Sequence, residues 1–247
     1  MAEEEKIRGH AKHALQNLVN KKKGWKERLS SFLWEIFIII VAVNITLWFH
    51  SWSEKRHDRK LEKNFLIGTR NDLNIVEGNL KNFEAFFQPV LDYYDSVWIQ
   101  MNEHRINKKF IDANSSYLFR TAYFFYDNSR YESYKSSGSL RLIENDSLSM
   151  KIAFIYTVLF PKREYADQTI FNTRRQFIDT YIGSKARIDS SGIMYVSELL
   201  DNPEVRYQMY NQKFILQEMM NQKKEMVQEI DDLIAQIDNE LKKRFNY

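Results

Sequence analysis

The chain has no cysteine, and it has only three prolines and seven glycines among its 247 residues. Without cysteine there is no disulfide, no thiol nucleophile and no cysteine-ligated metal. Because proline and glycine most often interrupt regular structure, their scarcity favours long helices. The 36 basic and 33 acidic residues nearly cancel and form no long basic patch, so we expect no nucleic-acid partner.

Sequence motifs of common enzymes are also missing. There is no glycine-rich phosphate loop, no Gly-x-Ser-x-Gly and no His-Glu-x-x-His. His10 and His13 are three residues apart and could share a metal, but no third ligand accompanies them, so two surface histidines are the better interpretation. We therefore expect no catalytic residue, no metal and no cofactor. An enzyme whose site is assembled from residues far apart in the sequence stays open as an alternative.

What the chain does have is one long apolar run, residues 32–49, in which only Glu35, Asn44 and Thr46 are not apolar. Eighteen helical residues extend about 27 Å, close to the ~30 Å hydrocarbon thickness of a bilayer. The remaining chain is too polar to surround such a helix as a core element would require. No small-x-small cleavage site follows the run, so we predict an uncleaved signal anchor, with residues 31–52 as a transmembrane helix.

Aromatic and basic residues border this run on both sides, as membrane interfaces favour. The expected membrane-interface anchors are Trp34, Trp48, Trp52, Lys23, Lys26, Arg28 and Arg56. Basic residues are similarly frequent before and after the run, so charge alone gives a weak orientation. The 195 residues that follow a signal anchor should be exported regardless of local charge. We therefore expect residues 1–30 to form a cytoplasmic amphipathic and basic segment, and residues 53–247 a periplasmic domain.

Two polar side chains inside the run are candidates for transmembrane helix packing. Glu35 lies about one turn inside, where a carboxylate can face the headgroups. Asn44 lies near mid-depth, where an unpaired amide is costly, so we hypothesise that it bonds to a transmembrane helix of a second copy or a partner. The simpler alternative is that Asn44 is tolerated singly. Because Glu35 has no companion acid, a proton-pathway role is the less favoured interpretation.

Two apolar patterns with steps of three and four residues predict long helices. The first follows the run and includes Leu66, Leu73, Val76, Leu80 and Phe83; the second includes Met226, Ile230, Leu233, Ile237 and Leu241 and is interrupted by Lys223. The later helix should begin with Asn202 as N-cap and Pro203 as its first residue, and should continue to Phe245. We expect these first and last long helices to pair antiparallel, with coiled-coil character, in an elongated all-α bundle continued from the transmembrane helix.

Between the two long helices the sequence predicts shorter helices. Gln88-Pro89 should mark a turn or kink. Residues 117–126 should be helical, with an aromatic stripe that most often belongs to a core, although a sugar- or peptide-binding platform is an alternative. Gly138 suits the end of one helix, and Asp146 suits the N-cap of the next, which should end near Pro161. A further helix is expected from about residue 163 to residue 182.

The stretches "EIFIIIVAVNITLWFHSWSEKRHDRK" and "YKSSGSLRLIENDSL" resemble a family of single-pass membrane proteins of Bacteroidota that has no assigned activity. The matching positions are Glu35, Trp52, Ser136, Ser137, Gly138 and Leu140. Asn44 departs from the family pattern, because it lies nearer the middle of the span than the polar residues of that family do. The resemblance implies a bacterial inner membrane and implies no catalytic function.

These features together predict a membrane-anchored, non-enzymatic interaction subunit or scaffold. We expect it to be a homo-oligomer, or to bind a membrane-protein partner through its transmembrane helix. An alternative is a ligand sensor whose exported bundle shifts the transmembrane helix. Because only about thirty residues precede the span, such a sensor would need a partner to produce an output.

Overall fold

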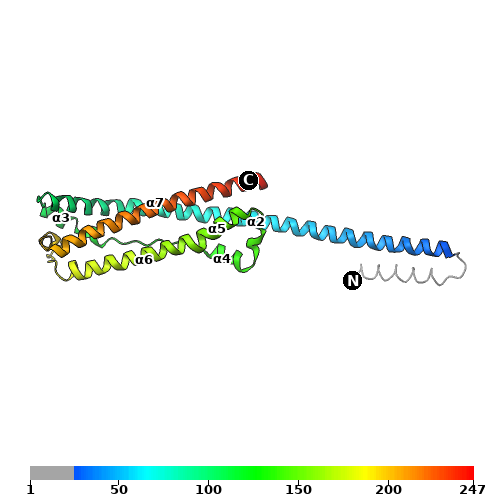
Figure 1. Ribbon diagram of the computed structural model, residues 1–247, viewed down its shortest axis with the longest axis horizontal. Helices are drawn as coiled ribbons and strands as arrows, with labels where there is room; N and C mark the ends of the chain where they lie inside the picture. The colour runs from blue at the N-terminus through cyan, green and yellow to red at the C-terminus, as the bar shows by residue number, and fades with distance from the viewer. Residues whose placement is uncertain (1–24) are drawn as a thin grey trace. The chain divides into compact units, whose positions relative to one another are not determined.

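The computed structural model describes residues 25–247, which are almost entirely helical (Figure 1). The α-helices are α2 (Trp25–Asn102), α3 (Lys108–Ala113), α4 (Ser129–Ser136), α5 (Asp146–Phe154), α6 (Phe160–Phe177) and α7 (Pro203–Phe245). Short 3-10 helices are η1 (Ser115–Phe119), η2 (Ser139–Leu142) and η5 (Val196–Leu199), and π-helical segments are η3 (Ile155–Leu159) and η4 (Ile178–Gly183). Within residues 25–247 the only sheet-like pairing is one isolated bridge between Ile188 and Met194. The predicted all-α class is confirmed.

The chain divides into two compact units, Met1–Leu61 and Glu62–Tyr247. The second unit is a helical bundle, and its first long helix is the part of α2 that begins at Glu62. We call the two ends of this bundle the Glu62 end and the Asn102 end.

In the bundle, α2 and α7 run antiparallel over their whole shared length (Figure 1). Ion pairs mark the register: Arg70 with Asp238 at 3.0 Å, Glu84 with Lys224 at 3.2 Å, and Asp95 with Lys213 at 2.7 Å. The intervals between the paired residues of α2 equal the intervals between their partners in α7, which run in the opposite direction. This regular register is expected for two straight antiparallel helices whose apolar stripes face each other. The predicted pairing of the first and last long helices is therefore present.

The two apolar stripes form most of the bundle core. Leu66, Leu73, Val76, Leu80, Phe83, Met226, Ile230, Leu233, Ile237 and Leu241 are all buried, and none is more than 7% exposed. All but Phe83 belong to one core cluster, which α5 and η3 complete with residues such as Ile152 and Ile155. Phe83 begins a second cluster that extends to the Asn102 end. Removing these side chains from water is the main force that holds α2 against α7.

Pro89 does not end the first helix, so the turn that we gave as one of two expectations there is wrong. α2 continues through it to Asn102. Proline cannot donate the usual backbone hydrogen bond, which is a cost in a helix interior. The flanking residues Phe87 and Val90 are almost fully buried, and Arg120 donates to the carbonyl of Phe86 in the preceding turn at 3.4 Å. Tertiary packing therefore outweighs the local penalty.

The break expected near Pro161 is absent as well. α5, η3, α6 and η4 follow one another without interruption from Asp146 to Gly183, and this run packs against α7. Pro161 lies in the first turn of α6, directly after the π-helical segment. A π-helical turn changes the hydrogen-bond pattern locally, which lets a helix continue past a residue that lacks an N–H group.

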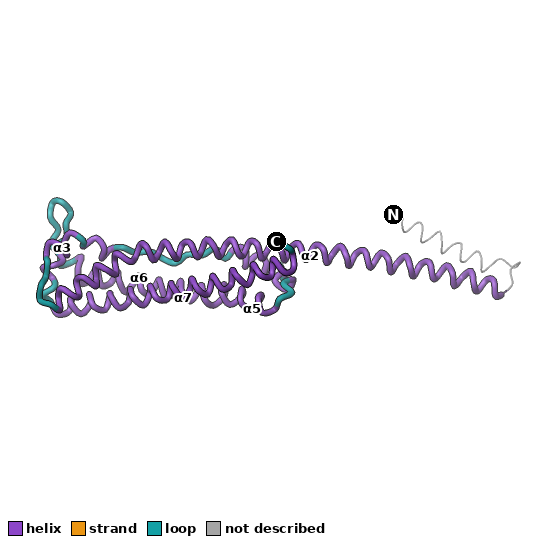
Figure 2. The backbone as a smooth tube through the Cα atoms, turned by 90° about the horizontal axis from the view of Figure 1, so that it is seen from above, coloured by secondary structure: helices purple, strands orange, loops and turns teal. Residues whose placement is uncertain are grey.

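The prediction of a helix over residues 117–126 is wrong for most of that stretch. Only η1 is helical there, and residues 120–128 run extended along the bundle (Figure 2). Burial alternates as in a strand: Phe124 is 5% exposed, whereas Tyr123 and Phe125 are 50% and 72% exposed. A run of aromatic residues fits both a helical and an extended periodicity, and the contacts described below decide for the extended one.

The helix ends predicted at Gly138, Asp146 and Asn202 lie close to those observed. Gly138 follows α4 with a φ of 70°, a left-handed conformation that glycine adopts without strain. Asn145, rather than Asp146, caps α5, and its side chain accepts a hydrogen bond from the N–H of Leu148. Asn202 caps α7 and Pro203 is its first residue, as predicted.

Candidate functional site

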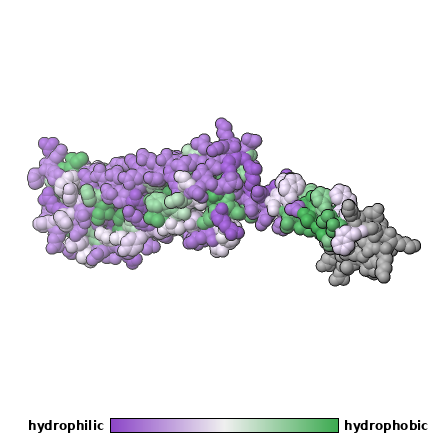
Figure 3. Space-filling view, turned by 45° about the vertical axis from the view of Figure 1, so that its right-hand side comes forward, coloured by the Kyte–Doolittle hydropathy of each residue, from purple (hydrophilic) through white to green (hydrophobic). Residues whose placement is uncertain are grey.

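The apolar part of α2 is the first candidate site. Within residues 25–247 this helix alone is long and apolar enough to cross a membrane, and none of its most apolar 18-residue window is buried. Its hydrophobic side chains gather into one continuous band on the surface of the first unit (Figure 3). Large apolar side chains such as Phe37, Leu47 and Phe49 are each more than half exposed. A band of this kind marks an interaction with lipid or with another protein.

Asn44 lies on the exposed surface of this band. Its Nδ2 donates to the carbonyl oxygen of Ile40, one turn earlier, at 2.7 Å. Thr46 does the same to Ala42, at 2.9 Å. An asparagine amide has two N–H donors and one carbonyl acceptor, so this single bond leaves capacity for a second helix. Glu35 also lies on α2, where it is partly buried.

Aromatic residues are stacked at both ends of the band. Trp34 stacks on Phe37 with ring centroids 5.3 Å apart. Trp48 and Trp52 stack at 6.5 Å, and the guanidinium of Arg56 lies 4.6 Å from the Trp52 ring centroid. Trp48, Trp52 and Arg56 therefore form one column along the helix. Two amphipathic rings followed by a cation are typical of a membrane–water boundary.

The remaining anchors and the two histidines are not placed. Lys23, His10 and His13 lie outside the described residues, as does most of the segment 1–30, and so do the side chains of Lys26 and Arg28.

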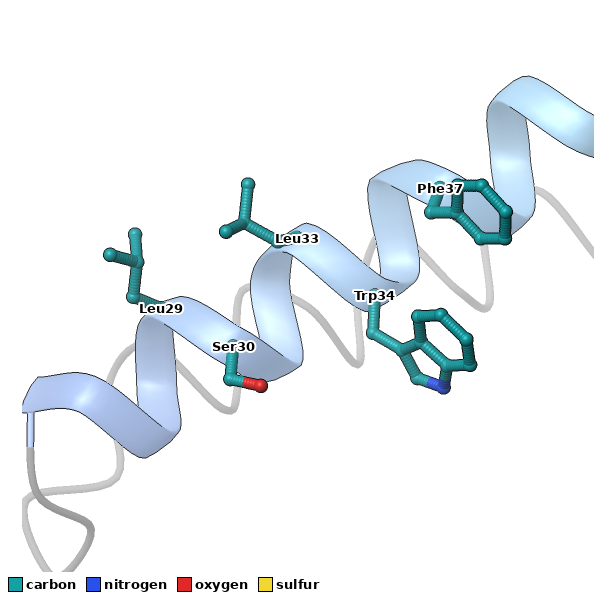
Figure 4. Close-up of a pocket in the computed structure, with 5 residues that line it drawn as sticks. All are labelled: Leu29, Ser30, Leu33, Trp34 and Phe37. Atoms are coloured by element: carbon teal, nitrogen blue, oxygen red, sulfur yellow. The ribbon is translucent and has the colours of Figure 1, made fainter.

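A shallow hollow accompanies the start of the band (Figure 4). Its lining residues are Leu29, Ser30, Leu33, Trp34 and Phe37, all from successive turns of α2. Side chains of one helix cannot enclose a small molecule, so this hollow is part of the apolar surface rather than a separate ligand site.

At the Glu62 end of the bundle, Arg244 joins three carboxylates. It pairs with Glu62 of α2, with Glu144 at 2.8 Å and with Glu240 at 3.6 Å, and its own side chain is only 14% exposed. Asn145 adds a hydrogen bond to Glu240 at 2.9 Å. Arg244 therefore fastens α7 to the first turn of the bundle and to the loop before α5.

A second polar group is buried in the middle of the bundle. The Nζ of Lys223 lies 2.6 Å from Oδ2 of Asp167, which also accepts the backbone N–H of Phe124 at 2.9 Å. The ammonium lies 5.3 and 5.0 Å from the ring centroids of Phe83 and Phe124. Burial lowers the pKa of Lys223, and the adjacent Asp167 carboxylate opposes that change. This contact holds the extended segment between α6 and α7.

Arg174, two turns further along α6, is the third charged member of this buried group. Its Nη2 donates to the carbonyls of Leu118 and Arg120, at 3.2 and 3.3 Å. Sequence reasoning missed both Asp167 and Arg174. The available signal was Lys223, because a lysine within an otherwise apolar stripe needs a buried partner.

The Asn102 end carries aromatic residues on its surface. Trp98 of α2 and Tyr210 of α7 meet with ring centroids 4.5 Å apart, and Arg206 donates to the carbonyl of Met101 at 3.2 Å. Nearby, Asp112 accepts two bonds from Ser197, from its N–H and its hydroxyl, both at 2.8 Å. These contacts close the bundle at this end.

Comparison with protein-family models, curated proteins and solved structures found no match. Within the described residues, no group of three or more histidine and acidic side chains could hold a metal ion. The resemblance to a Bacteroidota membrane family stays a prediction.

Proposed function

We propose that this protein is a single-pass protein of the bacterial inner membrane that acts without catalysis, as an interaction subunit or scaffold. The observation that carries the proposal is the apolar window of α2, which the described part of the chain leaves wholly uncovered. Each Å² of apolar surface left in water costs about 25 cal/mol, and a lipid bilayer removes that cost. Within the span, Asn44 and Thr46 each donate a hydrogen bond to a backbone carbonyl of their own helix, which lowers the cost of placing these polar groups in lipid.

The partner contact in this proposal is made by the transmembrane helix. Asn44 lies near mid-depth of the span and retains hydrogen-bonding capacity beyond its bond to Ile40. A second copy of this helix, or the helix of another membrane protein, would satisfy that capacity. The bundle then serves as the exported part of the assembly, with its buried ion pairs used for structure.

Topology is the first test of the proposal, and the absence of native cysteine makes it direct. A single cysteine is introduced either before the span, as Ala2→Cys, or on the bundle, as Tyr207→Cys, where the native side chain is 65% exposed. With a cytoplasmic N-terminus, a membrane-impermeant maleimide labels only the Tyr207→Cys chain in intact spheroplasts and labels both after lysis. The reverse pattern would overturn the orientation.

Assembly is the second test. The full chain is extracted from native membranes with detergent and analysed by crosslinking and native mass spectrometry. A stable complex of fixed composition supports the scaffold. A chain that stays in the supernatant after high-speed centrifugation without detergent would overturn membrane anchoring.

A ligand sensor is the second candidate, because α2 contains both the apolar window and the first long helix of the bundle. A ligand bound by the bundle could then act on the span through one continuous helix. This function predicts that crosslinks between span residues change when ligand is added. Crosslinks that do not respond to any periplasmic extract favour the scaffold.

A further inference from the structure

Arg174 has more hydrogen-bond donors than partners, although it is almost completely buried. Arg174 is 3% exposed, and its Nη2 donates to the carbonyls of Leu118 and Arg120. The Nε and Nη1 atoms are shielded from solvent and have no hydrogen-bond partner. A guanidinium cannot lose its proton in a protein, so these donors remain charged and unsatisfied. Buried donors of this kind indicate an unseen water molecule or ion.

The charge around Arg174 is also unbalanced. The buried group contains two cations, Lys223 and Arg174, and one carboxylate, Asp167. That carboxylate is already engaged by Lys223 at 2.6 Å and by the N–H of Phe124. None of the ion pairs formed by the described residues includes Arg174. Its other polar neighbour is Tyr94, whose ring centroid lies 5.8 Å from the guanidinium and whose hydroxyl interacts with Arg174. Burial raises the pKa of this phenol although Arg174 opposes that change, so Tyr94 stays neutral and does not balance the charge. One buried positive charge is left over, which is costly.

A small cavity adjoins Arg174. Its polar lining comes from Arg174, Asp167 and Thr121, and its apolar lining from Phe87, Ala122, Ile170, Phe171 and Met219. The cavity measures about 10 Å³, which is room for one water molecule or a monatomic ion. Polyatomic anions such as sulfate or a carboxylate-bearing metabolite are too large for it.

We propose that this cavity binds a monatomic monovalent anion, chloride under cellular conditions, held by the Nε and Nη1 groups of Arg174. A water molecule would satisfy the two donors but would leave the excess charge. An anion satisfies both, and Asp167 does not repel it strongly because Lys223 neutralises that carboxylate. Since Arg174 also holds the carbonyls of Leu118 and Arg120, the bound ion fixes the start of the extended segment against α6.

The test is the thermal unfolding of the full chain in detergent, in sodium chloride and in sodium gluconate at equal ionic strength. At chloride ten times the Kd, the folding equilibrium constant rises about tenfold, which raises Tm by roughly 3–6 °C. The variant Arg174→Gln should lose this shift. The matched control is Arg175→Gln, which changes the next residue of α6, an exposed arginine paired with Asp179 at 3.6 Å. Arg175→Gln should keep the shift.

A second measurement uses the native chain alone, so it does not require the Arg174→Gln variant to fold. Crystals of the native chain grown with bromide in place of chloride should show one anomalous peak beside Nε and Nη1 of Arg174. A water molecule at that position with no anomalous signal would overturn the proposal. So would equal Tm values in chloride and gluconate, or a chloride shift that Arg174→Gln retains.

Discussion

The ammonium of Lys223 and the carboxylate of Asp167 lie 2.6 Å apart, with side chains only 3% and 5% exposed. Lys223 comes from α7 and Asp167 from α6, and the same carboxylate accepts the N–H of Phe124 from the extended segment. One charged contact therefore joins three parts of the chain that are far apart in sequence. Because both side chains are buried, the pair is sensitive to the loss of either partner.

Removing the lysine should be strongly destabilising. Lys223→Met keeps most of the side-chain volume but leaves the Asp167 carboxylate buried without its cation, so we expect a loss of about 3–5 kcal/mol in the free energy of unfolding. The double variant Lys223→Met with Asp167→Asn should cost less than the two single changes added together, because it leaves no unpaired charge. Urea unfolding of the full chain in detergent measures both.

The neighbouring lysine supplies the control. Lys224 pairs with Glu84 at 3.2 Å, but the two side chains are 55% and 42% exposed. Lys224→Met should change the free energy of unfolding by less than about 1 kcal/mol. Equal costs for the two methionine variants would contradict the argument.

The apolar stripe of α2 predicts a contrast between two residues in the same turn. Leu73 is fully buried, whereas Ile75 is 64% exposed. Leu73→Ala should lower the free energy of unfolding by about 2–5 kcal/mol, because it removes buried methyl groups and leaves a cavity. Ile75→Ala should change it by no more than about 0.5 kcal/mol. Thermal melts of the two variants make the comparison, and similar Tm values would argue against the observed register of α2 and α7.

Two glycines of α2 predict different responses to alanine. A Cβ at Gly78 meets nothing within 4 Å, so Gly78→Ala should stabilise the helix by about 0.5–1 kcal/mol. A Cβ at Gly68 would clash with the guanidinium of Arg130, whose Nε donates to Asp72 at 2.7 Å. Gly68→Ala must displace Arg130, so the lost ion pair offsets the gain and the net change should be close to zero. Melting curves that rank the variants in the opposite order would refute this account.

Asn44 should matter for association and not for folding. Asn44→Leu removes the amide at mid-depth of the span, and we expect the dimer or complex to weaken by about 1 kcal/mol, roughly fivefold. Val43→Leu changes the adjacent residue without altering polarity and should have no effect. Crosslinking yield in native membranes measures both chains, and an Asn44→Leu chain that crosslinks as well as the native one would support the view that Asn44 is tolerated singly.

The loop after η4 contains a carboxylate, Asp189, whose hydrogen bonds should depend on pH. Asp189 accepts hydrogen bonds from the hydroxyl and N–H of Ser191, from the N–H of Ile193 and from the hydroxyl of Tyr195, and these lower its pKa from 3.8 to about 2. Because the folded-state pKa is lower than the unfolded one, the stabilisation is present above pH about 3.8 and disappears as pH falls through about 2. Amide chemical shifts of Ser191 and Ile193 should titrate with a midpoint near 2. A midpoint near 3.8 would mean that the loop bonds do not favour the ionised form.

Much of the fold could be predicted from local pattern. The stripe from Met226 to Leu241 predicts a long helix because its spacing repeats over many turns, and the pair Asn202-Pro203 marks its start. Likewise, the length and polarity of residues 32–49 identify a membrane-length helix without reference to any contact. Periodicity over long distances and capping chemistry are local properties, so the sequence carries them explicitly.

The candidate sites depend on contacts that local pattern does not contain. Nothing near Asp167 or Arg174 in the sequence indicates that either is buried, because each is surrounded by polar residues of α6. Pro89 reads as a helix end until the burial of its neighbours Phe87 and Val90 is known.

By itself, the sequence determined the helical class, the membrane-length apolar segment, and the two stripes that pair in the bundle. Only the tertiary structure decided that residues 120–128 are extended, that Lys223 is paired with Asp167, and that Arg174 is left with unsatisfied donors beside a cavity. The physical reason is that burial sets the cost of a charge or an unpaired donor. Burial depends on segments distant in sequence, whereas periodicity and helix capping depend on neighbours along the chain.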